Sequence, residues 1–259
     1  MHDICRDLEL EHADLDGVVA AMSEREWSAA TPSVGWSIRD QISHLWFFDV
    51  RALMALTDPQ EFERDKQQLL AGGGTDASVV PGRSMSGDEL LALWREDRAL
   101  LLEAARVVDP SARVPWYGPS MAARSFITAR LMETWAHGQD VVDALGASRP
   151  ASERLRHVAH IGVRARPFSY AVNGMTLPEA DVRVVLQAPD GAEWSWGASA
   201  SDTVQGTALD FCLVVTQRRH LADTDLSVVG EVATEWISIA QAFAGPPGGG
   251  RSAGEFPRH

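Results

Sequence analysis

The segment from Ala129 to Leu145 constrains the fold most, because its apolar residues recur at the spacing of an α-helix. Glu133 and His137 stand four residues apart in it, so their side chains lie one above the other on one helix face. A carboxylate among apolar neighbours such as Leu131 raises the free energy of the fold unless it is paired or bound to a metal. The segment therefore predicts a helix that carries two ligands for a divalent metal ion.

A third ligand is needed, because catalytic zinc takes three protein ligands and keeps one position open. His44 is the candidate, in the second amphipathic helical segment GWSIRDQISHLWFF. We expect His44, Glu133 and His137 to meet inside a helix bundle and to bind a catalytic divalent metal, first of all Zn²⁺. Two imidazoles and a carboxylate also suit Ni²⁺, iron or cobalt. A purely structural alternative stays open, because Glu–His pairs at this spacing also stabilise surface helices.

Other titratable residues compete for a role at this site. Asp140 follows His137 by about one turn, so it is either a partner that orients the imidazole or an exposed acid. His157 and His160 are three residues apart and can share a helix face, but the sequence offers them no third ligand. We expect these two to be packing or surface residues.

The first part of the chain predicts a four-helix bundle. Ser37 with Asp40 and Ser86 with Glu89 have the spacing of capping boxes, in which each residue of a pair bonds the backbone of the other. Helical segments are expected at about 3–27, 37–56, 86–107 and 121–145, with a short helix at 66–70, a glycine link at 72–74 and an aromatic loop at 111–120 that could form a pocket rim.

The second part of the chain predicts a smaller α+β domain. Asp190-Gly191 between two β-prone runs is a hairpin signal. Further helices are expected at 152–164, 207–219 and 231–243. The predicted fold class is α+β, mainly α, with domains at 1–150 and 151–245 and a flexible Pro- and Gly-rich tail at 246–259.

Composition excludes several classes of function. The formal net charge of −13 over 259 residues disfavours binding to nucleic acid and to anionic membranes. No apolar run approaches the length of a membrane-spanning helix. Two distant cysteines, Cys5 and Cys212, give no disulfide framework and favour a reducing cytoplasm. We expect a cytoplasmic protein that acts on a small molecule, as a monomer or a homodimer.

The two metal-ligand segments carry a resemblance to a known family. GWSIRDQISHL and RLMETWAHGQDVVDAL resemble the ligand helices of DinB-like metal-binding bundles, and most of all those of the mycothiol-dependent maleylpyruvate isomerase family. Residues 206–245 are similar to the C-terminal domain of an uncharacterised branch, sometimes labelled after wyosine base formation. The resemblance implies zinc ligands at His44, Glu133 and His137, basic catalytic residues at Arg218 and Arg219, and mycothiol as a cofactor.

The resemblance implies an isomerase or S-transferase in which a metal-held thiolate attacks a small electrophile. Two alternatives stay open on the residues alone. A hydrolase, lyase or cyclase would use the open metal position for water. A non-enzymatic binding protein would hold an apolar ligand in a pocket lined by Trp46, Trp116 and Trp135, which are among nine tryptophans in the chain.

Overall fold

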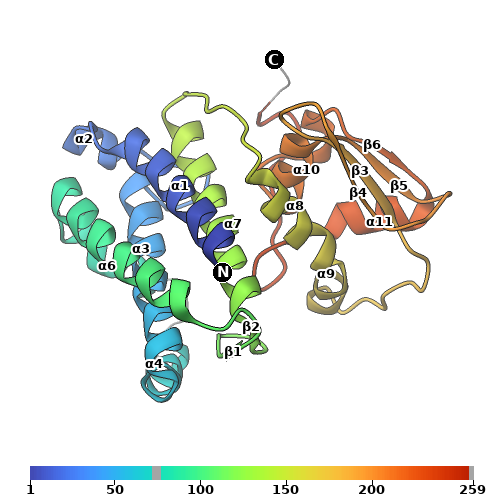
Figure 1. Ribbon diagram of the computed structural model, residues 1–259. Helices are drawn as coiled ribbons and strands as arrows, with labels where there is room; N and C mark the ends of the chain where they lie inside the picture. The colour runs from blue at the N-terminus through green and yellow to red at the C-terminus, as the bar shows by residue number, and fades with distance from the viewer. Residues whose placement is uncertain (72–76, 257–259) are drawn as a thin grey trace. The chain divides into compact units, whose positions relative to one another are not determined.

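The computed structural model describes residues 1–71 and 77–256, and the chain forms two compact units. The first unit is Met1–Arg149 and the second is Pro150–His259 (Figure 1). The glycine link predicted at 72–74 lies outside the described residues. In the part of the chain that the structure describes, no helix has both the length and the apolar character that a membrane crossing requires.

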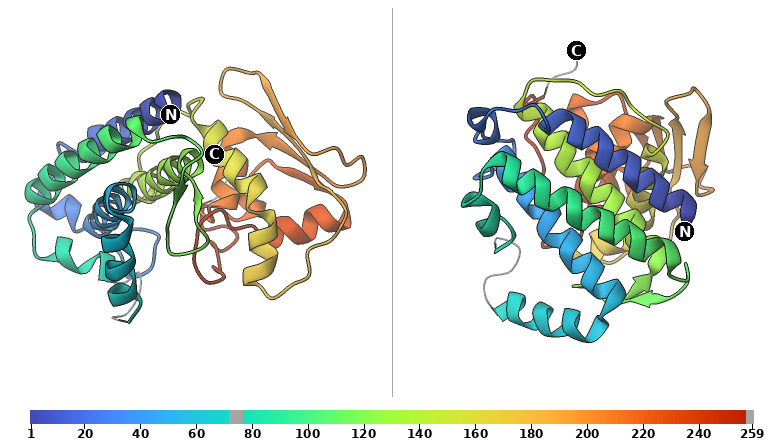
Figure 2. Two further views of the ribbon diagram at one scale, coloured as in Figure 1. Left: turned by 60° about the horizontal axis from the view of Figure 1, so that its bottom comes forward. Right: turned by 60° about the vertical axis from the view of Figure 1, so that its left-hand side comes forward.

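The first unit is built on a bundle of four long helices. They are α1 (His2–Val19), α3 (Ile38–Thr57), α6 (Gly87–Val107) and α7 (Ala123–Ala144). Helix α3 packs against both α6 and α7, and α1 packs against α7 and α6 (Figure 2). Their apolar faces meet in a core that includes Leu15, Trp27, Ile42, Leu90, Trp94 and Val141.

Side-chain caps determine where the bundle helices begin. The Ser37 hydroxyl accepts a hydrogen bond from the Asp40 backbone, and the Asp40 carboxylate accepts one from the Ser37 backbone, so both predicted features of this capping box are present. Ser86 and Glu89 cap α6 in the same way. The predicted first helix is too long, because Ser23 forms a capping box of its own and begins a separate short helix, α2 (Glu24–Trp27).

Shorter elements connect the bundle helices. Helix α4 (Pro59–Ala71) starts at a proline, which is tolerated in the first turn, and is longer than the short helix expected at 66–70. Helix α5 (Val80–Arg83) packs against α3. The aromatic loop at 111–120 is closed by two short paired strands, β1 (Arg113–Val114) and β2 (Met121–Ala122), directly before α7.

The second unit contains a four-stranded mixed sheet in the order β4-β3-β5-β6. Strands β3 (Arg183–Gln187) and β4 (Glu193–Trp196) form the predicted antiparallel hairpin. Gly191 in its turn has a φ of 88°, which favours glycine. Strand β5 (Thr203–Thr207) runs parallel to β3, and β6 (Ser227–Val229) pairs with β5 in the antiparallel direction.

Helices flank this sheet in the second unit. They are α8 (Leu155–Arg164), α9 (Arg166–Val172), α10 (Ala208–Val215) and α11 (Glu231–Ile239). Helix α8 packs on α10, and the two approach closely where Gly162 faces Val215. The segment from residue 246, expected to be flexible, contacts the same unit through Gly248, whose backbone N–H donates to Gln241 Oε1 at 3.1 Å. The predicted fold class, α+β and mainly α, is confirmed.

Candidate metal centre

The bundle brings His44, Glu133 and His137 together. His44 lies on α3 and the other two lie on α7, and one possible ligand atom from each residue lies within 4.8 Å of the others. Among residues 1–71 and 77–256 this is the only group of three or more such side chains. His137 Nε2 lies 3.3 Å from Glu133 Oε2. Two ligands at zinc bond lengths in a tetrahedral site lie about 3.4 Å apart, so this pair already has the spacing of metal ligands.

Gln41 determines which nitrogen of His137 is free to bind a metal. Gln41 Oε1 lies 2.5 Å from His137 Nδ1, and Gln41 Nε2 donates to Thr31 Oγ1 at 2.9 Å. The Thr31 hydroxyl in turn donates to the Trp36 carbonyl, so its oxygen must accept from the Gln41 amide nitrogen. The Gln41 oxygen therefore faces the imidazole and accepts from Nδ1–H, which leaves Nε2 as the nitrogen available to a metal.

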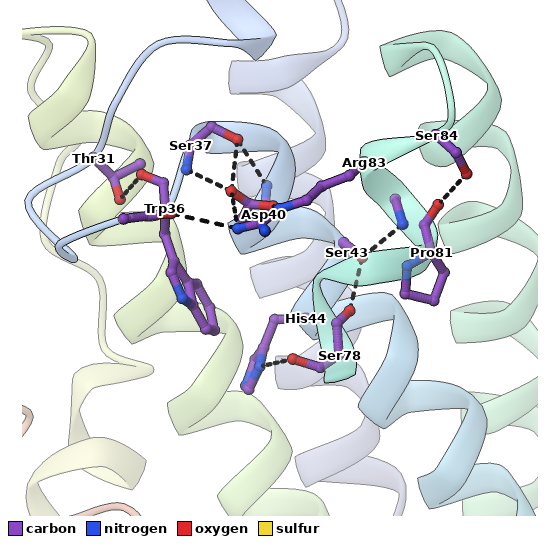
Figure 3. A network of polar contacts seen from close by, with 12 residues as sticks. Thr31, Trp36, Ser37, Asp40, Ser43, His44, Ser78, Pro81, Arg83 and Ser84 are labelled. Carbon is purple, nitrogen blue, oxygen red and sulfur yellow. Dashed lines mark hydrogen bonds and ion pairs between the residues drawn. The ribbon is translucent and has the colours of Figure 1, made fainter. Parts of the chain in front are cut away.

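Ser78 contacts the corresponding ring nitrogen of His44. His44 Nδ1 lies 2.9 Å from Ser78 Oγ, which leaves Nε2 available as a ligand (Figure 3). The position of Ser78 is fixed in turn, because its carbonyl accepts from Ser43 Oγ at 2.8 Å. The Ser43 hydroxyl also accepts from Gly82 N–H at 3.2 Å. A side chain at Gly82 would place its Cβ 2.5 Å from Ser43 Cβ, so this contact requires glycine.

Aromatic rings surround the two imidazoles. The His44 and His137 rings lie 4.4 Å apart between centroids. Trp36 stacks on His137 at 6.0 Å and also lies 5.1 Å from His44, while Phe48 meets His44 edge-on at 4.7 Å. These rings place aromatic surface against the two imidazoles. The Glu133 side chain is 22% exposed against 11% for His137, so the carboxylate is the more accessible of these two ligands.

Of the two roles that the sequence left open for Asp140, that of an exposed acid is wrong. It is fully buried rather than exposed, and its Oδ2 accepts a hydrogen bond from Ser33 Oγ at 3.1 Å. The partner of His137 Nδ1 is Gln41. That nitrogen is therefore oriented from the neighbouring helix α3.

The two predicted catalytic arginines lie in the second unit, directly after α10. Arg218 is buried and donates from Nη1 to the Thr216 carbonyl at 2.7 Å. Arg219 donates to the Arg218 carbonyl, and its guanidinium lies 4.1 Å from the centre of the Phe256 ring. Their assignment as catalytic residues stays a prediction.

Neither cysteine is suited to act as a nucleophile. Cys5 and Cys212 are both free and fully buried. Burial raises the pKa of each thiol above its ordinary value, so the reactive thiolate is disfavoured at neutral pH. A thiol reaction at the metal centre would therefore need a thiol from outside the chain.

The three tryptophans of the alternative binding pocket have separate surroundings. Trp46 Nε1 donates to Asp97 at 2.7 Å, Trp116 stacks on Phe62, and Trp135 lies beside Arg149. Within the described residues, no recorded ring contact joins any two of these tryptophans. The observed contacts thus give no support to a common pocket lined by all three.

Comparison with known proteins identifies the family. The family model described as the mycothiol maleylpyruvate isomerase N-terminal domain matches residues 8–142, which include all three candidate ligands. The chain belongs to this family. The predicted resemblance is confirmed for the N-terminal domain.

Relatives and solved structures extend the likeness over most of the chain. Uncharacterised proteins from two strains of Mycobacterium tuberculosis are 47% identical over 248 residues, which cover 95% of this chain and 96% of the relative. The crystal structure of the mycothiol-dependent maleylpyruvate isomerase matches with a TM-score of 0.61 at 15% identity, covering 87% of this chain and 92% of that one. A histidine-to-alanine variant of that isomerase matches with a TM-score of 0.60 at 14% identity. At these identities the solved structures show a shared fold.

Two positioning residues were missed by reasoning from sequence. Gln41 precedes His44 by three residues and shares its helix face, so its position alone could have marked it. Ser78 lies in a segment without any periodic pattern, and nothing in the local sequence predicts its contact with His44.

Proposed function

We propose that this protein is a metal-dependent enzyme that uses mycothiol to act on a small electrophile, as an isomerase or an S-transferase. The observation that supports it best is the His44, Glu133 and His137 cluster, with both imidazoles held through Nδ1, in a chain of the mycothiol maleylpyruvate isomerase family. The donor set fits Zn²⁺, with Ni²⁺ as the second choice.

The metal ligands and the residues that contact them would have different roles. His44 and His137 would supply neutral Nε2 ligands, while Gln41 Oε1 and Ser78 Oγ would accept the Nδ1 protons of His137 and His44. Glu133 would add one negative charge and leave the metal with a net positive charge. A bound metal would lower the pKa of a thiol and hold the thiolate.

The thiol has to come from a cofactor, since Cys5 and Cys212 are buried with raised pKa values. In an isomerisation, the thiolate sulfur would form a bond to one alkene carbon while the π electrons move onto a conjugated carbonyl. Rotation about the resulting single bond and expulsion of the thiolate would then restore the alkene in the other geometry. In an S-transfer, the C–S bond would remain and the carbanion would take a proton. We propose that Arg218 and Arg219 bind an anionic group of the substrate or of the thiol.

The test is turnover by zinc-loaded protein with and without mycothiol. Suitable substrates are maleylpyruvate and a chromogenic alkylating electrophile. We expect turnover that requires the thiol, is abolished in Glu133→Gln and persists in the matched control Glu103→Gln, which changes an exposed glutamate of α6. Turnover that is independent of thiol would replace this function with metal-dependent water chemistry. Equal turnover in Glu133→Gln and wild type would refute the role of the cluster.

A further inference from the structure

A single buried carboxylate joins three helices of the bundle. Asp49 on α3 is fully buried. Arg130 on α7 donates from Nε to Asp49 Oδ1 at 3.0 Å, and Trp94 on α6 donates from Nε1 to Oδ2, also at 3.0 Å. Arg130 also reaches the Leu45 carbonyl of α3 at 3.4 Å. The ion pair is almost sealed from water, since the Arg130 side chain is only 4% exposed.

The neighbouring histidine is not the cation that pairs with Asp49. His12 on α1 lies with Nε2 3.8 Å from Asp49 Oδ2 and meets Trp94 edge-on. Neither ring nitrogen of His12 has a hydrogen-bond partner among the described residues. Burial lowers the pKa of His12 to about 4, so this imidazole is neutral near pH 7. Arg130, which donates directly to the carboxylate, is the cation paired with Asp49.

Stability alone does not explain a buried pair of this kind. Removing two charges from water costs free energy that their attraction barely offsets, and well-packed apolar replacements often leave a protein equally or more stable. The best-attested benefit of a buried polar pair is that it fixes how helices align. The position of the pair in the bundle indicates which site depends on that alignment.

The pair lies close to the metal ligands on the same two helices. Arg130 precedes Glu133 by three residues, about 4.5 Å along α7, and Asp49 follows His44 by five, about 7.5 Å along α3. Gln41 contacts His137 while Asp49 contacts Arg130, so α3 and α7 run in opposite directions, and His44 and Glu133 lie between these two contacts. A slide of one residue would displace the ligands by about 1.5 Å, far more than the roughly 0.2 Å that a metal site tolerates.

We propose that the Asp49–Arg130 ion pair fixes the register of α3 against α7 and thereby positions the three metal ligands. The inference rests on the proposed metal-binding function. Asp49 and Arg130 are positioning residues, since neither is among the ligands. Their effect should appear in metal affinity and in the imidazole tautomers, and it should be separable from an effect on stability.

The experiment replaces the pair with apolar residues of similar volume in the double variant Asp49→Leu/Arg130→Met. The control makes the same substitutions in the exposed pair Asp3–Arg124, which joins α1 to α7. Zn²⁺ affinity is measured by chelator competition, stability by urea unfolding, and the Nδ1–H signals of the two ligand histidines by NMR of the metal-free protein.

We expect the double variant to remain folded, with a urea midpoint close to that of wild type or moderately below it, because two buried charges are removed while Trp94 Nε1 loses its acceptor. Its Zn²⁺ affinity should fall at least about tenfold, because the ligands lose their preset spacing. Its two Nδ1–H signals should broaden or disappear, while the control stays at wild-type values. Wild-type affinity together with unchanged signals would overturn the proposal.

A conservative variant covers the case in which the double variant fails to fold. Arg130→Lys keeps the charge but loses the planar group that bonds both Asp49 and the Leu45 carbonyl. We expect its Zn²⁺ affinity to fall about threefold or more, and wild-type affinity would overturn the proposal. If wild-type protein binds no Zn²⁺, the proposed function fails, and the NMR comparison still tests whether the pair fixes the helix register.

Discussion

Replacing Gln41 with leucine should weaken metal binding while leaving the fold intact. In the metal-bound protein Nε2 of His137 would be committed to the metal, so Nδ1 must carry the proton and needs an acceptor. Gln41→Leu removes that acceptor from a side chain that is mostly buried. In the metal-free protein the imidazole can move its proton from Nδ1 to Nε2. The unpaired donor therefore costs free energy only in the metal-bound protein.

The size of the effect follows from the cost of a buried donor without a partner, about 1–3 kcal/mol. That corresponds to a loss of about 10–100-fold in metal affinity, the range usual for residues that orient metal-ligating histidines. Chelator competition near neutral pH measures it. Gln41→Glu keeps an acceptor and should bind Zn²⁺ at least as well as wild type. Gln139→Leu, which changes another buried glutamine of the bundle, is the matched control. Affinity of Gln41→Leu within about twofold of wild type would refute the assigned role.

Three further predictions address stability and the source of the thiol. The pKa of His12 is about 4 in the folded protein, below the ordinary 6.5. Its contribution to the free energy of unfolding is therefore fully present above pH 6.5 and is lost as pH falls toward 4. Urea unfolding of wild type should lose about 2 kcal/mol from this group between pH 7 and 5, and His12→Leu should lack this loss. Gly82→Ala should cost about 1–3 kcal/mol and weaken Zn²⁺ binding, because the new Cβ would clash with Ser43 and displace the segment that holds a ligand. Replacing Cys5 and Cys212 with serine should leave mycothiol-dependent turnover intact in the folded fraction, and a complete loss at full folding would assign a cysteine to the reaction.

Local signals account for most of what the sequence predicted of the fold. The capping boxes at Ser37 and Ser86 marked the starts of two bundle helices, and Asp190-Gly191 marked the hairpin. The missed break after α1 was also readable, because Ser23 and Glu26 have the capping-box spacing. Strands β5 and β6 were not predicted, because they are short and their pairing depends on partners far away in the sequence.

In the candidate site, too, the residues that depend on local sequence could be predicted and those that depend on distant contacts could not. Glu133 and His137 share a face by helix periodicity, and the segment around His44 carries the family pattern. Ser78 and the Arg130 partner of Asp49 could not be predicted, since each contact joins residues whose alignment only the packed bundle determines.

The most direct test of the central claim is the metal content of purified, zinc-loaded protein by elemental mass spectrometry. Wild type should retain about one ion per chain, as a single three-ligand site requires. His137→Ala should lose it, while His160→Ala, which changes an exposed histidine of α8, should keep it. Absence of metal from wild type, or equal retention in His137→Ala, would contradict a metal centre at these residues.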